Sequence, residues 1–179
     1  MHRLFAAIRP PADIRARLLL LMGGVPGARW QEDDQLHLTL RFIGEVDRHR
    51  ANDIADGLAA VRFAPFTIAL RGVGTFDRRG MVDTIWAGVE PHDPLAHLHR
   101  KIDRACVQAG LPAESRAFLP HITLARLSRP APGIDVFLAL QAGLFSPPFV
   151  VEGFTLFEST LGRSGARYAP VADYPASGG

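Results

Sequence analysis

Two short segments with the same pattern lie almost half the chain apart, and they limit how the chain can fold. Residues 37–40 read His-Leu-Thr-Leu and residues 121–124 read His-Ile-Thr-Leu, so their histidines are 84 positions apart (121 minus 37) in a chain of 179 residues. Both segments alternate polar and aliphatic residues, which is typical of a β-strand with one buried face. Each strand would present an imidazole and a hydroxyl on one face and bury two aliphatic side chains on the other.

The elements expected around these two strands also repeat. Periodicity and turn residues predict helices over residues 11–22, 47–61, 93–109 and 134–142, and strands over 3–8, 36–44, 66–76, 82–89, 119–127, 149–158 and 167–173. From residue 11 onward, each half therefore has the order helix, strand, helix, strand, strand. This repeat suggests that the chain arose by duplication.

We predict an α+β fold with two lobes. Two antiparallel sheets, related by a pseudo-two-fold axis and flanked by helices, would meet at a central cleft that holds both His-x-Thr motifs. The 179 residues fit a single domain, with lobes of roughly residues 1–91 and 92–174 by the sequence repeat. Residues 175–179 are expected to be a frayed tail.

Composition narrows the class of protein. Hydrophobic residues make up 47% of the chain and charged residues 21%, as in ordinary soluble globular proteins. The single cysteine, Cys106, has no internal partner, which favours a reducing compartment and predicts a cytoplasmic protein. The apolar run Leu18–Met22 is too short to span a membrane. We also expect the protein to be a monomer.

Arginine supplies almost all of the positive charge. Of 20 basic residues only Lys101 is a lysine, and the net charge is +2. Guanidinium groups bind phosphate with two parallel hydrogen bonds, so a phosphate-bearing partner fits this bias. A biased genome composition would produce the same excess of arginine, so the charge alone does not identify the partner.

The paired motif supplies the groups that cleavage of a phosphodiester requires. A base must activate the incoming oxygen and an acid must protonate the leaving oxygen, on opposite sides of phosphorus. One histidine can be neutral and another charged near neutral pH, and hydroxyls can donate to the phosphate oxygens. The alternative is that both histidines are ordinary structural residues, but two such copies arise by chance with a probability on the order of 10⁻⁴.

The residues around both motifs resemble a known family. Residues 37–45 (HLTLRFIGE) and 120–127 (PHITLARL) are similar to the paired motifs of the two-histidine phosphoesterase superfamily. More narrowly, they resemble the bacterial and archaeal RNA 2′,3′-cyclic phosphodiesterases, historically called 2′-5′ RNA ligases. Leu4–Ile8 and Trp30 also fit that group. The resemblance implies a bilobal fold with both motifs in the cleft, and metal-independent hydrolysis of RNA 2′,3′-cyclic phosphate ends to 2′-phosphates.

The resemblance also implies roles for individual residues. His37 would be the proton donor to the leaving 3′ oxygen and His121 the proton acceptor from water, while Thr39 and Thr123 would bind the phosphate oxygens. The motifs themselves are nearly symmetric, so the assignment of acid and base comes from the family alone. The resemblance implies no metal and no cofactor.

Two arginines near the motifs are further candidates for binding substrate. Arg126 matches a family arginine near the phosphate, although strict alternation along the strand puts it on the face opposite His121. Arg41 shares the face of His37 by the same alternation. Both arginines are therefore predicted to bind substrate, Arg126 on the condition that its strand bends.

Several other functions and sites remain as alternatives. The substrate could be another cyclic phosphate or a 2′-5′ oligonucleotide, 2′-5′ RNA ligation could run in reverse, or the protein could bind RNA without catalysis. We expect His92, His97 and His99 to be solvated helix residues, Gly72–Gly74 to form a bulge rather than a nucleotide loop, and Cys106 to be an inert core residue.

Overall fold

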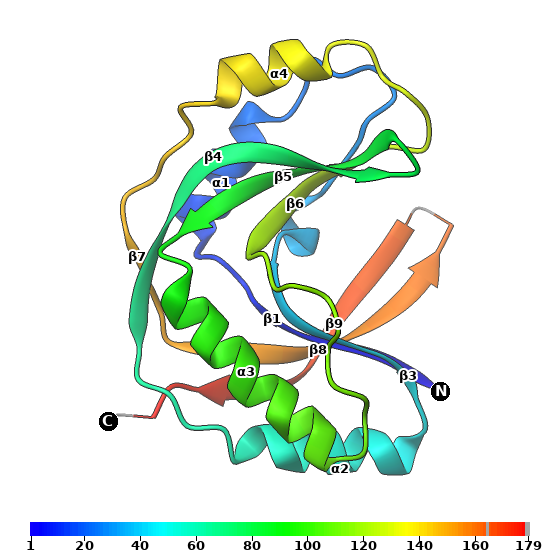
Figure 1. Ribbon diagram of the computed structural model, residues 1–179, viewed down its shortest axis with the longest axis vertical. Helices are drawn as coiled ribbons and strands as arrows, with labels where there is room; N and C mark the ends of the chain where they lie inside the picture. Colours follow the sequence, from blue (N-terminus) through cyan, green and yellow to red (C-terminus); the bar gives the residue numbers. More distant parts are fainter. Residues whose placement is uncertain (164, 178–179) are drawn as a thin grey trace.

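The protein has an α+β fold, described by a computed structural model for residues 1–163 and 165–177 (Figure 1). The elements, in chain order, are β1 (His2–Ile8), α1 (Ala12–Leu21), β2 (Arg29–Trp30), the 3₁₀ helix η1 (Asp33–Gln35), β3 (Leu38–Val46), α2 (Arg48–Ala59), β4 (Phe66–Arg78), β5 (Met81–Glu90), α3 (Asp93–Gln108), β6 (His121–Arg126), α4 (Ile134–Gln141), β7 (Phe149–Val151), β8 (Gly153–Gly162) and β9 (Gly165–Pro175). Every predicted helix and strand is present. The predicted strand 149–158 is divided into β7 and β8, and β2 was not predicted.

The strands pair in the order β7-β4-β5-β6-β3-β1-β8-β9, with β2 beside β6, and all pairings are antiparallel. We call β7-β4-β5-β6 with β2 the β5 wing, and β3-β1-β8-β9 the β1 wing. One pair of residues, Leu38 and Ile122, joins them. The α+β class and the antiparallel strands are confirmed, and the two expected sheets are the wings of one continuous sheet.

Each wing contains strands from both halves of the sequence. The β1 wing combines the early strands β1 and β3 with the late strands β8 and β9, while the β5 wing combines β4 and β5 with β6 and β7. Helices α2 and α3 pack against the β1 wing, and α4 lies at the β5 wing (Figure 1). The wings are thus a different division of the chain from the sequence repeat, and the repeat boundary near residue 91 stays a prediction.

The aliphatic residues of both motifs are in the core. Leu38, Leu40, Ile122 and Leu124 are each at most 1% exposed. Burying one such side chain contributes about 2 kcal/mol to folding. This burial fixes the register of β3 and β6, because a shift of one residue would move the aliphatic set onto the opposite face.

The β4–β5 hairpin has positive φ angles both at its turn and at a bulge. The β4–β5 hairpin turns at Arg79-Gly80, both with positive φ (54° and 77°), which is the geometry of a tight two-residue hairpin turn. Gly72 has a φ of 65° and lies where the β4–β5 register shifts, so the predicted bulge is confirmed.

The predicted tail is ordered over most of its length. Pro175 belongs to β9, and the Ala176 and Ser177 amides donate to the carbonyl oxygens of Glu152 and Phe63 (2.7 and 2.9 Å). These backbone bonds tie the segment to the body of the protein, so the prediction is wrong for residues 175–177. Residues 178 and 179 lie outside the part of the chain that the structure describes.

Candidate active site

The single pair that joins the wings brings the two motifs side by side. Leu38 and Ile122, each one position after a motif histidine, are direct cross-strand partners. The residues that flank this pair, His37 and Thr39 on one side and His121 and Thr123 on the other, therefore lie where the two wings join. The two imidazoles and two hydroxyls thus form one cluster on the face opposite the buried leucine and isoleucine.

Both imidazoles are oriented by the same hydrogen bond. The Nδ1 atom of His37 lies 2.6 Å from the Gln35 carbonyl oxygen, and that of His121 lies 2.7 Å from the Leu119 carbonyl oxygen. A carbonyl can only accept, so Nδ1 carries the proton in each ring. Each neutral histidine is therefore left with an unprotonated Nε2, the atom available to take up or deliver a proton.

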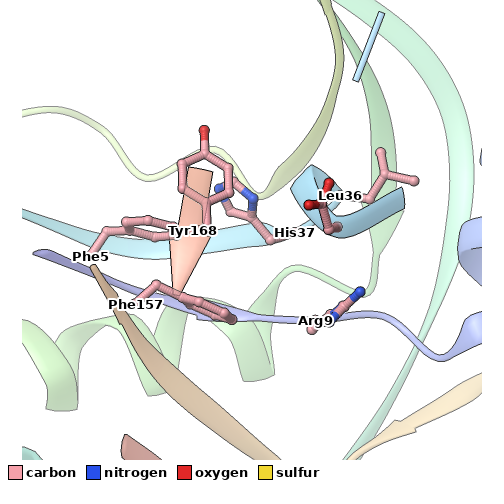
Figure 2. Close-up of a pocket in the computed structure, with 7 residues that line it drawn as sticks. Phe5, Arg9, Leu36, His37, Phe157 and Tyr168 are labelled. Atoms are coloured by element: carbon pink, nitrogen blue, oxygen red, sulfur yellow. The ribbon is translucent and has the colours of Figure 1, made fainter. Parts of the chain in front are cut away.

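Aromatic rings pack against both histidines. Phe5 and Tyr168 lie 4.9 and 5.1 Å from the His37 ring, and Figure 2 shows Tyr168 standing beside that ring. Phe76 packs edge-on to His121 at 4.8 Å, and Trp86 lies 6.1 Å away. These rings limit rotation of the imidazoles and exclude water from their sides.

The same surroundings disfavour the charged imidazolium. Burial lowers the pKa of His37 to about 4, although the Gln35 carbonyl opposes this, and the charges of His121 and Arg126 lower it further. Burial also lowers the pKa of His121, against the Leu119 carbonyl, and Arg126 adds to the effect. Each histidine is therefore neutral at pH 7 until an anion enters the site.

A cleft of about 1060 Å³ opens at this cluster. His121, Thr39 and Arg126 line it, and His37 lines a smaller neighbouring pocket with Phe5 and Tyr168 (Figure 2). Thr123 is half-buried between the motif's two buried aliphatics. The structure thus brings both histidines and both threonines of the sequence prediction to one region of the sheet.

A β-bulge places Arg126 on the same face as His121. Along β5 and β6, Trp86 pairs with Thr123 and Ile85 pairs with Ala125, so Leu124 has no partner in β5. Leu124 and Ala125 are consequently both buried. After this extra residue the side chains alternate between the two faces again. Arg126 is therefore not on the face opposite His121, and the bend in the strand on which its predicted role depended is present.

The guanidinium of Arg126 is held in place from β5. Its Nη1 donates to the Thr84 hydroxyl oxygen at 2.9 Å, and Thr84 in turn donates to the Asp83 carboxylate at 2.8 Å. Arg126 also lines the cleft, with its charge acting on both histidines. The structure therefore places Arg126 at the cleft with both histidines, and its binding of substrate stays a prediction.

The corresponding bulge in β3 turns Arg41 away from the histidines. Ala6 pairs with Arg41 and Ala7 with Thr39, so Leu40 has no partner in β1. The Arg41 side chain is only 7% exposed and lies on the α3 side of the sheet. The expectation that Arg41 shares the face of His37 is therefore wrong for its side chain, although Arg41 is among the residues that line the cleft.

The guanidinium of Arg41 is fully engaged by the protein. It donates to the Asp103 carboxylate (2.8 Å), the carbonyl oxygens of Phe42 and Pro112 (both 2.6 Å) and the Glu114 carboxylate (3.5 Å). The Asp103 carboxylate also accepts from the Glu114 amide at 3.1 Å. Arg41 thus anchors the segment that precedes β6 to helix α3.

This arrangement predicts that Arg41 contributes to stability rather than to substrate binding. Replacing Arg41 with alanine leaves the carboxylates of Asp103 and Glu114 without their cation, and we expect a loss of about 3 kcal/mol in the free energy of unfolding. Urea denaturation of R41A and of the unmodified protein measures the difference. Unchanged stability together with weaker substrate binding would instead return Arg41 to the substrate site.

Sequence reasoning gave no role to Phe42, which the bulge exposes. Phe42 is 59% exposed and lines the cleft. Phe42 lies five positions after His37, just as Arg126 lies five positions after His121. Phe42 follows the bulge in β3, and Arg126 follows the bulge in β6. Because nothing in the segment marks the bulge, the sequence alone gives no signal that Phe42 faces the cleft.

His99 is not a solvated helix residue as expected, because the protein holds its ring by a hydrogen bond and by stacking. His99 is half-buried: its Nδ1 donates to the Leu40 carbonyl at the bulge (2.6 Å) and its ring stacks on Phe118 at 4.3 Å. The expectation of a solvated residue is thus wrong for His99. Within residues 1–163 and 165–177, no three His, Cys, Asp or Glu side chains gather in a way that could hold a metal ion.

The buried thiol of Cys106 agrees with the sequence analysis. Cys106 is fully buried, and burial raises the pKa of its thiol to about 11, so the expectation of an inert core residue is confirmed. No helix in the described part of the chain has both the length and the apolar character to cross a membrane.

Comparison with known proteins gives the same family throughout. The profile of the 2′-5′ RNA ligase superfamily matches residues 10–163. An RNA 2′,3′-cyclic phosphodiesterase of Aeropyrum pernix is 34% identical over 86% of this chain and 89% of its own length. One from Thermus thermophilus is 33% identical over 98% of this chain and 91% of its own.

Solved structures also match over nearly the whole chain. A crystal structure of a Thermus thermophilus protein has a TM-score of 0.80 and 29% identity, and Escherichia coli LigT in its apo form has a TM-score of 0.78 and 28% identity. Each comparison covers 98% of both chains. On the family profile, these relatives and the paired motifs of its cleft, this chain belongs to the 2′-5′ RNA ligase superfamily.

Proposed function

We propose that this protein hydrolyses the 2′,3′-cyclic phosphate at RNA ends to a 2′-phosphate, with His37 as the general acid and His121 as the general base. One observation carries the proposal: two imidazoles at the start of adjoining strands, each with Nδ1 tied to a backbone carbonyl, lie beside neighbouring pockets, and the charge of His121 acts on His37. The relatives named RNA 2′,3′-cyclic phosphodiesterase support the choice of substrate.

The proposed reaction needs one proton transfer at each histidine. His121 Nε2 takes a proton from water as the water oxygen bonds to phosphorus. The bond between phosphorus and O3′ breaks, and O3′ takes a proton from His37 Nε2. The extra negative charge collects on the non-bridging oxygens, where Thr39, Thr123 and Arg126 can donate hydrogen bonds.

The substrate would itself prepare His37 to act as an acid. His37 is neutral in the free protein because its pKa is about 4, whereas an anionic phosphate beside it favours the protonated form. The exposed ring of Phe42 offers a surface on which the terminal nucleobase can stack. LigT has been solved in complex with 3′-AMP and with phosphate, ligands that carry the same two chemical parts.

The hydrolase proposal is tested by the product end. Purified protein is incubated with a cyclic-phosphate oligonucleotide in EDTA, and the product is identified by ³¹P NMR. We expect turnover to a 2′-phosphate at an unchanged rate. No turnover with or without EDTA would reject the hydrolase, a 3′-phosphate would reject the proposed leaving group, and loss of activity only with EDTA would reject a metal-independent mechanism.

The lowered histidine pKa values predict an acidic optimum for kcat/KM. This parameter follows the free enzyme, in which one imidazole must be protonated and the other neutral. Because the pKa of His37 is about 4 and that of His121 is below its usual 6.5, kcat/KM should peak between those values and fall as the pH rises to 8. The profile of kcat should lie at higher pH, since bound phosphate raises both pKa values. A kcat/KM optimum above pH 7 would contradict this electrostatic description.

Two properties accompany the proposal. We infer that the protein acts as a monomer, because the cluster of histidines and threonines is contributed entirely by one chain, and that it is cytoplasmic, because its one cysteine is a buried thiol. Sedimentation of the purified protein tests the first property, and localisation of a tagged chain in its own host tests the second.

A further inference from the structure

A second arginine lies directly beside Arg126. In the β2–β6 pair, Arg29 is the cross-strand partner of Arg126, and Trp30 is the partner of Ala125. Trp30 and Ala125 face the core, where Trp30 packs against Phe137 at 5.3 Å. Arg29 and Arg126 are therefore together on the opposite face, which is the face of the cleft.

This pair of like charges is costly unless an anion lies between or beside the two side chains. Directly opposite residues in antiparallel strands have Cβ atoms about 5 Å apart, and like charges at that separation are destabilising. Within the described residues, neither Arg29 nor Arg126 forms an ion pair with a carboxylate, unlike Arg15 and Arg41. The carboxylate connected to Arg126, that of Asp83, accepts from the Thr84 hydroxyl rather than from a guanidinium, so among the described residues no direct ion pair offsets the positive charge at this edge of the cleft.

Tyr168 of β9 contributes a phenol beside His37. Its ring packs edge-on to both His37 and Phe5 (5.1 and 5.0 Å), and in Figure 2 its hydroxyl points away from Phe157. Burial raises the pKa of Tyr168, whereas Arg126, Arg3 and Arg29 act to lower it. The Tyr168 hydroxyl is thus a neutral hydrogen-bond donor next to His37, and the charges of Arg126, Arg3 and Arg29 act on it. Tyr168 is also beyond residue 163, where the match to the family profile ends.

We propose that Arg29 and Tyr168 form a second phosphate site beside Arg126, which holds the phosphodiester on the 5′ side of the terminal nucleotide. The inference rests on the proposed function, because the cyclic phosphate must lie between His37 and His121 for the neighbouring phosphate to reach this edge. Guanidinium groups suit this role, since they bind phosphate oxygens with paired hydrogen bonds. The site makes the end of an RNA strand, rather than a mononucleotide, the preferred substrate class.

Three substrates separate the second phosphate from the rest of the RNA. The first substrate, a nucleoside 2′,3′-cyclic phosphate, has no second phosphate. The second substrate is the same compound with a 5′-phosphate, which supplies the second phosphate as a monoester. The third is a dinucleotide with a cyclic phosphate end, which supplies the second phosphate as a diester. We expect the unmodified protein to have a kcat/KM about 10- to 100-fold higher on the second and third than on the first, corresponding to about 1.5–3 kcal/mol from charge-assisted hydrogen bonds.

Replacing Arg29 with alanine should remove most of that preference. In R29A the ratio of kcat/KM between the dinucleotide and the nucleoside substrate should fall toward one. R29K should retain part of the preference for the dinucleotide, and Y168F should lower the ratio about threefold. The dependence of log kcat/KM on log salt for the dinucleotide should weaken by about 0.7 in R29A. The matched control is R17A, which removes an exposed arginine of α1 that has no ion pair among the described residues.

The outcomes distinguish this inference from the proposed function. If the unmodified protein hydrolyses the nucleoside substrate but gains nothing from the added 5′-phosphate, or if R29A and R17A keep the same ratio, the second phosphate site is wrong while the hydrolase stands. If none of the three substrates is hydrolysed, the proposed function itself is wrong.

Discussion

Replacing His37 or His121 with alanine is expected to lower kcat for a cyclic-phosphate RNA end by about 10²- to 10⁴-fold. Each imidazole transfers one proton in the proposed reaction, and the rings packed against the two histidines belong to phenylalanine, tryptophan and tyrosine, which do not exchange protons readily near neutral pH. Chromatographic separation of substrate and product over time measures the rate. The double variant should be little slower than either single variant, since the two groups act in one step.

Asparagine variants separate loss of chemistry from loss of structure. An asparagine amide can donate to the carbonyl oxygens of Gln35 and Leu119 as Nδ1 does, but it has no group at the position of Nε2. H37N and H121N should therefore be as inactive as the alanine variants and unfold near the midpoint of the unmodified protein. H49A is the control, because His49 lies 91% exposed on α2. Activity within tenfold of normal in H37N or H121N would show that Nε2 is not the reacting atom.

Replacing Arg126 with alanine is expected to lower kcat by about 10²- to 10³-fold, the range found when one donor to a developing oxyanion is removed. Because Thr84 already positions the guanidinium, the group is in place before substrate binds. R126K should recover only part of the loss, since lysine provides a single point of charge rather than a fork.

The pH profile and a neighbouring variant check the role of Arg126. Its charge lowers the pKa of both histidines, so R126A should move both limbs of the kcat/KM profile to higher pH. R129A removes an exposed arginine three positions further on and should change neither rate nor profile. An R126A rate within threefold of normal would remove Arg126 from the phosphate site.

The sequence predicted those parts of the structure that depend on local periodicity. The order of helices and strands follows from alternating and helical hydrophobic patterns. The face shared by His37 and Thr39, and by His121 and Thr123, follows from the two-residue period of a strand. Burial of the intervening aliphatics then set the register that brings the motifs together.

Features that depend on pairing between distant segments could not be predicted. The bulges at Leu40 and Leu124 exist because β3 and β6 must each match a partner strand, and nothing in either segment marks the extra residue. They reverse the expected faces of Arg41 and Arg126. Tyr168 reaches His37 from β9, which joins the sheet through β8 and β1, so its place at the site is visible only in the folded chain.

The most direct test of convergence on one phosphate is histidine ¹H–¹⁵N NMR during titration with 2′-AMP, with signals assigned from single histidine variants. The Nε2 signals of His37 and His121 should shift together, with one dissociation constant and toward the protonated form, while His49 stays unchanged. If only one of the two rings responds, or if they titrate with different constants, the imidazoles do not share a phosphate and the proposed mechanism is wrong.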